Sequence, residues 1–180
     1  MLTLVTGGNG FVGAGVVRAL VRADAAVRVL LRPGSDRRNL AGLAVEIVEG
    51  DVREAAAVRR AMQGCAHVYH VAAFYSAHPA DAAQLYEINV QGTQNLLQAA
   101  QAAGVERFVH TSTIGAIGRP ADPNLLPTEE TPFNLEARAS HYVLSKRQGE
   151  QLALACAAQG KVPALVVHPT APVGIGDWRP

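Results

Sequence analysis

Tyr142 and Lys146 are the pair of side chains in this sequence whose types and spacing most directly suggest chemistry. They begin a segment of helical character, in which a separation of four residues places two side chains on one face, about one turn apart. A tyrosine hydroxyl ordinarily has a pKa of about 10, and a neighbouring ammonium lowers that pKa because it favours the phenolate. Such a tyrosine can act as a general acid or base near neutral pH, although the same spacing also occurs by chance at the start of exposed helices.

Three hydroxyl side chains, Thr111-Ser112-Thr113, end a β-rich segment earlier in the chain. At the carboxyl edge of a parallel sheet, such residues face the crevice in which ligands bind. A hydroxyl there can hydrogen-bond a substrate oxygen while the charge on that oxygen changes. We count Thr111 among the candidate cofactor-binding residues, and the order of the motifs along the chain argues against a chance match.

A glycine-rich turn, Thr6-Gly7-Gly8-Asn9-Gly10-Phe11-Val12-Gly13, lies between the first predicted strand and the first predicted helix. A strand that turns sharply into a helix while its backbone approaches a pyrophosphate has no room for side chains at Gly7, Gly10 and Gly13. The helix N-terminus, which begins at Phe11 and Val12, adds unpaired N–H groups and a positive dipole. A plain glycine-rich turn is the alternative, but the strand–turn–helix context favours dinucleotide binding.

The end of the second predicted strand indicates which dinucleotide would bind. NAD sites usually place an acidic residue there to hold the ribose hydroxyls, whereas this chain has Arg32, whose guanidinium can clamp a 2′-phosphate. The sequence therefore favours NADP, and the nearby Asp36 keeps NAD as an alternative. Arg37 and Arg38 are equally well explained as solvated surface charges.

Two further strand ends would contribute to the same site. Asp51-Val52 follows the third strand, where adenine would lie, and Ala72-Ala73 follows the fourth, where small residues let the backbone approach a cofactor. Both pairs also have simple explanations as loop residues.

The elements that position these residues alternate between short apolar runs and longer helical stretches. Alternation of this kind predicts a parallel sheet covered on both faces and, with right-handed crossovers, a doubly wound Rossmann-type α/β domain over residues 1–180. The expected strands are 2–5, 26–31, 45–48, 66–71, 107–110 and 164–167, and the expected helices are 11–23, 54–62, 81–103 and 140–159, with a long loop over 115–137.

Composition excludes several other classes of protein. The 180 residues are 49% hydrophobic and 17% charged with a net charge of +1, which disfavours disorder and general nucleic-acid binding. The two cysteines are far apart, and the six histidines form no metal-type set. No apolar run is long enough to span a membrane and no signal peptide precedes the first strand, so we expect a cytoplasmic protein.

The motifs together resemble the extended short-chain dehydrogenase/reductase superfamily, also called the NAD-dependent epimerase/dehydratase family. The resemblance covers residues 2–178 and is nearest to the hopanoid-associated sugar epimerase and dihydroflavonol 4-reductase-like groups. Besides the motifs above, it rests on Leu31-Arg32-Pro33-Gly34-Ser35, Asn89-Val90-Gln91-Gly92-Thr93 and Pro169-Thr170-Ala171-Pro172-Val173-Gly174.

This resemblance implies roles for individual residues. It makes Tyr142 the general acid/base, Lys146 its partner and a ligand of the ribose, and Thr113 the catalytic hydroxyl in place of the commoner serine. It also places Pro169 and Thr170 along the nicotinamide, and Phe74 and Tyr75 beside a small-molecule substrate. Independently of the resemblance, Asn89 would either kink or hydrate the long helix near the site, or serve equally well in core packing.

The implied function is that of an NAD(P)-dependent oxidoreductase or epimerase acting on a sugar-nucleotide-like or ketone substrate. Family members carry a second, smaller substrate domain after the sixth strand, which we expect to be largely missing here. A non-catalytic NAD(P)-binding module or an inactive fragment is therefore the alternative. A homodimer that forms through an exposed sheet edge is a further expectation.

Overall fold

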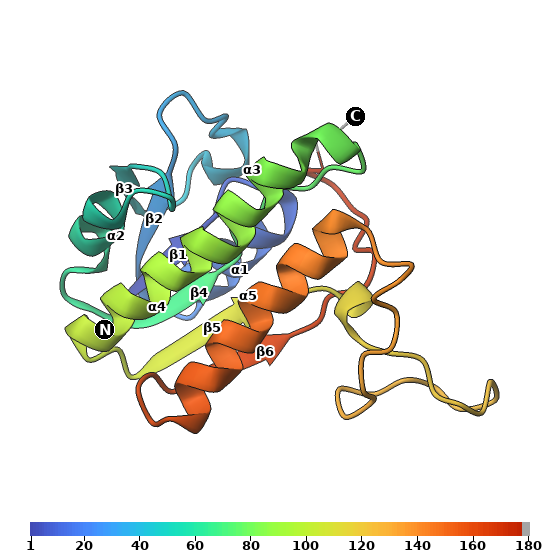
Figure 1. The fold of residues 1–180 in the computed structure, drawn as a ribbon. Coiled ribbons are helices and arrows are strands. Elements are labelled where there is room, and N and C mark those ends of the chain that lie inside the picture. Colours follow the sequence, from blue (N-terminus) through green and yellow to red (C-terminus); the bar gives the residue numbers. More distant parts are fainter. Residues whose placement is uncertain (178–180) are drawn as a thin grey trace.

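The computed structural model describes residues 1–177 (Figure 1), so the last three positions of the predicted domain, Trp178 among them, lie outside the described residues. Within this part the chain forms one sheet of six strands. They are β1 (Leu2–Thr6), β2 (Ala26–Leu31), β3 (Glu46–Glu49), β4 (Cys65–His70), β5 (Arg107–Thr111) and β6 (Ala164–Val167).

All neighbouring strands pair in parallel, in the order β3-β2-β1-β4-β5-β6. This is the strand order of a Rossmann-type doubly wound sheet, with its topological switch between β1 and β4. The predicted fold class is therefore confirmed. The carboxyl ends of β1, β2, β4 and β5 bring the glycine-rich turn, Arg32, Ala72 and the Thr111-Ser112-Thr113 triplet to one edge of the sheet.

Helices cover the two faces of the sheet unequally. The α-helices are α1 (Phe11–Arg22), α2 (Ala55–Met62), α3 (Ala82–Tyr86), α4 (Gly92–Ala103) and α5 (His141–Ala158). In Figure 1, α2, α4 and α5 lie in front of the sheet and α1 lies behind it. Within residues 1–177, no helix is both long and apolar enough to cross a membrane.

Two apolar clusters follow from this layering, because side chains alternate between the faces of each strand. Behind the sheet, Val5, Val29 and Leu31 pack with Val17 of α1. In front, Leu4, Val68 and Phe108 pack with residues of α2, α4 and α5. The strands are thus apolar on both faces, as a parallel sheet between helices requires.

The predicted helix over 81–103 is confirmed as one helical run over 82–103, but the helix changes type within its length. A 3₁₀ turn at Pro79–Asp81 leads into α3, and a π-helical turn, Glu87–Gln91, separates α3 from α4. The predicted long loop also opens with a short 3₁₀ helix at Ile114–Ala116. Asn89 is buried within this π-helical turn.

Candidate functional site

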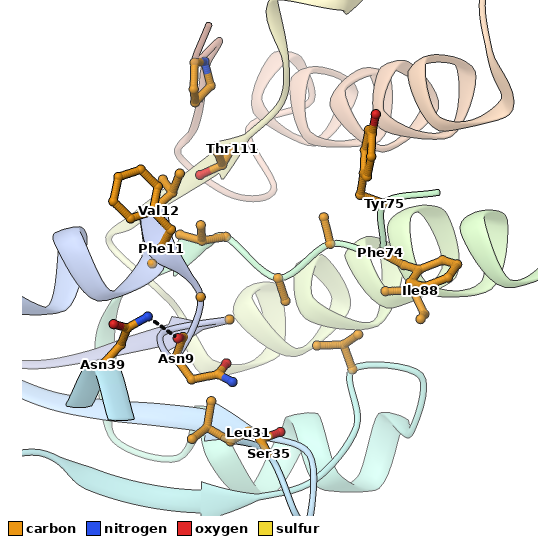
Figure 2. Close-up of a pocket in the computed structure, with 18 of the residues that line it drawn as sticks. Asn9, Phe11, Val12, Leu31, Ser35, Asn39, Phe74, Tyr75, Ile88 and Thr111 are labelled. Atoms are coloured by element: carbon orange, nitrogen blue, oxygen red, sulfur yellow. Dashed lines mark hydrogen bonds between the residues drawn. The ribbon is translucent and has the colours of Figure 1, made fainter. Parts of the chain in front are cut away.

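One cavity of about 720 Å³ runs along the carboxyl edge of the sheet. Every residue predicted for the cofactor, the substrate or catalysis lines it. Figure 2 shows part of this lining, with Phe11, Val12 and Thr111 toward one side, Phe74, Tyr75 and Ile88 toward another, and Leu31 and Ser35 below. The structure therefore brings together residues that are as far apart in the sequence as Gly7 and Thr170.

The glycine-rich turn has no room for side chains. Gly7 has a φ of +67°, and a Cβ there would lie 2.6 Å from the backbone nitrogen of Ala72. A Cβ on Gly13 would overlap the carbonyl oxygen of Gly7. The turn is thus packed backbone against backbone between β1, α1 and the end of β4, which is the local reason for glycine at these positions.

The N-terminus of α1 faces the same cavity. Its N-cap residue, Gly10, offers no side chain, and the first turn carries no acidic residue. The backbone N–H groups of Phe11, Val12 and Gly13 therefore have no side-chain cap, and the helix dipole adds positive potential there. This arrangement fits a pyrophosphate, since its charge and acceptor oxygens match those donors.

At the end of β2, the cationic residues have different environments. Arg32 lines the cavity and is exposed. Arg38 forms a salt bridge of 2.6 Å with Asp36, and Arg37 pairs with Glu49. Asp36 is thus engaged by Arg38, whereas Arg32 directly follows β2.

Asp51 and Val52 occupy the cavity wall beyond β3. The guanidinium of Arg53 holds the pKa of the Asp51 carboxyl below its usual value through a 2.8 Å pair. Gly92 packs directly over Val52, where a Cβ would come within 2.7 Å of a valine methyl group. The close approach of α4 thus fixes this loop against the sheet.

Tyr142 and Lys146 lie in the first turns of α5, whose N-cap, Ser140, accepts a hydrogen bond from the Val143 N–H. The Lys146 side chain is 2% exposed, and its Nζ donates to the Thr111 carbonyl oxygen at 2.7 Å. Burial lowers the pKa of Lys146 to about 8, while Glu150 acts in the opposite direction. An ammonium is therefore held inside the sheet edge, one turn from Tyr142.

Each residue of the strand-end triplet has a different partner. Thr111 accepts from Lys146 through its carbonyl, and Ser112 donates from Oγ to Glu150 Oε2 at 2.6 Å. The Thr113 Oγ accepts from the Gly115 N–H at 3.3 Å and lines the cavity with Tyr142. The Ser112 hydroxyl is thus engaged beneath the site, whereas Thr113 keeps its hydroxyl hydrogen for another acceptor.

Phe74 and Tyr75 are positioned by Asn89, which is buried in the π-helical turn. Asn89 accepts from the Phe74 N–H at 2.8 Å and donates to the Phe74 carbonyl at 3.0 Å, and its Nδ2 also reaches Ser145 Oγ at 3.0 Å. The Tyr75 ring lies edge-on to the Tyr142 ring, with centroids 4.8 Å apart. Asn89 thereby joins the predicted substrate loop to the helix that carries Tyr142.

A buried hydrogen-bond chain through His70 connects that turn to β1. Thr93 Oγ1 donates to the Asn89 carbonyl at 2.7 Å, so it must accept from His70 Nε2 at 2.9 Å. His70 Nδ1 then accepts from Thr6 Oγ1 at 2.8 Å, and Thr6 accepts from the Ala72 N–H. Desolvation lowers the pKa of His70 to about 3, so the ring is neutral and its tautomer is fixed.

Pro169 and Thr170 reach the cavity because the segment after β6 stays paired with the chain after β5. The Ile114 N–H donates to the Pro169 carbonyl at 3.1 Å.

Asn39 also lines the cavity and was not predicted from the sequence. Its Nδ2 donates to the carbonyls of Asn9 and Gly176 (Figure 2 shows the first of these bonds). Asn39 belongs to no recognisable motif, and only the fold brings these carbonyls to it.

The model of the NAD dependent epimerase/dehydratase family matches residues 3–180. The chain belongs to this family. It is 39% identical to sterol demethylase protein B of Methylococcus capsulatus over 180 residues, 100% of this chain and 54% of that protein. It is 42% identical to a putative dihydroflavonol 4-reductase of Synechocystis sp. over 176 residues, 98% of this chain and 50% of that protein.

A solved structure of a related protein is consistent with this family membership. A short-chain dehydrogenase/reductase superfamily protein of Agrobacterium tumefaciens with bound NAD superposes with a TM-score of 0.78 at 36% identity, covering 93% of this chain and 48% of that one. The predicted membership of the NAD dependent epimerase/dehydratase family is confirmed. The chain spans about half the length of the curated relatives it matches.

Proposed function

We propose that the cavity binds a nicotinamide dinucleotide and that this chain carries the cofactor-binding part of an NAD(P)-dependent oxidoreductase or epimerase. The reaction is hydride transfer at a carbinol or carbonyl carbon of a sugar-nucleotide-like or ketone substrate. The observation that supports this most strongly is that Tyr142, Lys146 and Thr113 share one cavity with the uncapped, glycine-rich N-terminus of α1.

In this proposal the glycine-rich turn and the N-terminus of α1 hold the pyrophosphate, and Asp51 and Val52 flank the adenine. Ala72, Ala73, Thr111, Pro169 and Thr170 line the remainder of the bound cofactor. A bound nicotinamide would supply the acceptor and donor of hydride. All other steps belong to side chains of this chain.

Tyr142 removes the proton from the substrate hydroxyl in the oxidising direction and returns it in the reducing direction. The Lys146 ammonium, fixed by the Thr111 carbonyl, favours the phenolate form of Tyr142 and holds ribose hydroxyls. Thr113 donates a hydrogen bond to the substrate oxygen, on which negative charge develops. Phe74 and Tyr75 bound the space next to Tyr142.

The cofactor in this proposal is NADP, with NAD as the alternative. Arg32 is exposed in the cavity and can pair bidentately with a 2′-phosphate. The engagement of Asp36 by Arg38 supports the same preference. Family membership alone is compatible with either dinucleotide.

A turnover assay with the matched variants Tyr142→Phe and Tyr86→Phe tests the catalytic role. Ketones and dihydroflavonols are supplied with NADPH or NADH, and oxidation of the cofactor is followed by absorbance. Nucleotide sugars are supplied with the oxidised cofactor, and the epimerised product is followed by chromatography, because epimerisation consumes no cofactor. We expect Tyr142→Phe to lower the rate by about 10²–10⁴-fold. Tyr86→Phe removes the same hydroxyl from a ring that lies edge-on to His141 and does not line the cavity, so the rate should stay near that of the parent chain.

Turnover that survives Tyr142→Phe would contradict this mechanism. Cofactor binding without turnover of any substrate class would instead favour a non-catalytic NAD(P)-binding module.

A cytoplasmic location and a homodimeric state belong to the same proposal. Cell fractionation tests the location, and light scattering of the purified chain tests the dimer.

A further inference from the structure

The carboxyl group of Glu150 lies under the cavity and is not used in the proposed reaction. Glu150 follows Lys146 by four residues, as Lys146 follows Tyr142, so the three side chains form a stripe along one face of α5. Both Lys146 and Glu150 are buried, with 2% and 7% exposure. Burying a carboxylate is costly unless it is paired and hydrogen-bonded, so its partners define its role.

Glu150 is held from two strands of the sheet. Its Oε2 accepts from Ser112 Oγ at 2.6 Å and from His168 Nε2 at 3.0 Å. Ser112 directly follows β5, and His168 directly follows β6. These two contacts fix the position of the Glu150 side chain.

Apart from Tyr142 and Glu150, the titratable groups around Lys146 are imidazoles. His70 of β4 and His110 of β5 are buried, and desolvation lowers both pKa values so that both rings are neutral near pH 7. Both ring nitrogens of His110 have no hydrogen-bond partner among the described residues, which is consistent with an uncharged ring. The third imidazole, that of His168, donates to Glu150. Glu150 lies one turn after Lys146 on the same face of α5 and is buried as well, so its carboxylate opposes the desolvation of the Lys146 ammonium.

We propose that Glu150 is a positioning residue of the site: its carboxylate, anchored by Ser112 and His168, keeps Lys146 in its ammonium form. Through Lys146 it would then set the protonation state of Tyr142, a consequence that rests on the proposed function. Glu150 itself does not line the cavity.

This proposal differs in a measurable way from a purely structural role. If Glu150 only ties α5 to the ends of β5 and β6, removing its charge changes stability and leaves the Lys146 equilibrium unchanged. If it holds the ammonium, the removal shifts that equilibrium toward the neutral amine. The protonation of Lys146 is therefore the decisive quantity.

The chain is well suited to that measurement because it contains two lysines, Lys146 and Lys161. After ¹³C labelling of lysine, NMR follows both Cε signals through a pH titration of the intact chain. Lys161 is exposed and serves as an internal reference. The measurement needs neither cofactor nor turnover, so its failure is distinguishable from a failure of the proposed function.

In Glu150→Gln, which preserves the side-chain shape, we expect the ammonium-to-amine ratio of Lys146 at a given pH to fall at least about tenfold. Glu136→Gln changes the net charge equally at an exposed position and should leave Lys146 unchanged. Glu150→Asp, which retains the charge, should restore part of the ratio. An unchanged Lys146 titration in a folded Glu150→Gln chain would overturn the proposal.

If Glu150→Gln does not fold, the reciprocal experiment replaces it. Coupling between two charges is symmetric, so removing the Lys146 charge must make the Glu150 carboxylate easier to protonate. In Lys146→Met, the ¹³C carboxyl signal of Glu150 should titrate at higher pH than in the parent chain. Identical Glu150 titrations in the two chains would overturn the proposal as well.

Discussion

The ammonium of Lys146 donates a 2.7 Å hydrogen bond to the carbonyl oxygen of Thr111, the last residue of β5. This bond ties α5 to the sheet at the point where the strand-end hydroxyls begin. It also fixes a positive charge in a buried position, which costs stability whenever that charge is present.

Stability should therefore depend on pH through Lys146. Its pKa is about 8 in the folded chain, against an ordinary value of 10.5. Between these pH values the unfolded chain binds more protons, so the free energy of unfolding rises with pH across this window. The cost of burying the ammonium is fully present below pH 8 and disappears by about pH 10.5, a change of about 3 kcal/mol.

Urea denaturation of the parent chain and of Lys146→Met at several pH values from 7 to 10.5 checks this. The difference between their unfolding free energies should change by about 3 kcal/mol over the window. For Lys161→Met, at an exposed site, the free energy of unfolding should change with pH as it does in the parent chain. If the free energy of unfolding of Lys146→Met also followed that of the parent chain across this pH range, Lys146 would not titrate there.

The turn that begins the cavity can be tested with two matched glycines. Gly7 and Gly34 both have positive φ values, +67° and +73°, but only Gly7 faces other atoms within 4 Å. Gly34→Ala should cost about 1–2 kcal/mol of stability for the backbone conformation alone. Gly7→Ala should cost about 1–3 kcal/mol more, because the new methyl group meets the Ala72 backbone. Equal losses in denaturation experiments would contradict this packing.

Much of the fold and site was predictable because it is encoded locally. The spacing of Tyr142 and Lys146, the glycines of the first turn and the strand–helix alternation are short-range patterns, and the structure gathers them at one edge. The π-helical turn at Asn89 was not predictable as such, because it depends on Phe74 and Thr93 supplying partners. The Glu150–His168 contact is long-range as well, since only the pairing of β5 with β6 brings the two together.

Asn89 gives a further prediction about the substrate side of the cavity. Asn89→Ala removes both hydrogen bonds to Phe74 and the one to Ser145, leaving buried polar groups without partners. We expect a loss of about 2–4 kcal/mol and a weakened NMR contact between the Tyr75 and Tyr142 rings.

Asn95→Ala is the matched control for Asn89. Asn95 is also a buried asparagine that bonds to backbone carbonyls, those of Val52 and Arg53. Its replacement should lower stability while leaving the Tyr75–Tyr142 ring contact intact. If both variants disturb that contact equally, Asn89 has no special role in positioning the loop.

Arg32 should determine the preference between the two dinucleotides. Arg32→Ala removes a charge-assisted pair to the 2′-phosphate and should weaken NADPH binding about 10–100-fold while affecting NADH little. Arg37→Ala is the control, because Arg37 pairs with Glu49 and does not line the cavity. Equal weakening of both dinucleotides would show that Arg32 does not read the phosphate.

The most direct test of the whole account is a fluorescence titration of the purified 180-residue chain with NADPH and with NADH. We expect saturable binding, with NADPH bound more tightly than NADH. A chain shown to be folded by circular dichroism that bound neither dinucleotide would contradict it, because the glycine-rich turn, the N-terminus of α1 and the strand ends would then be insufficient to form the cofactor site.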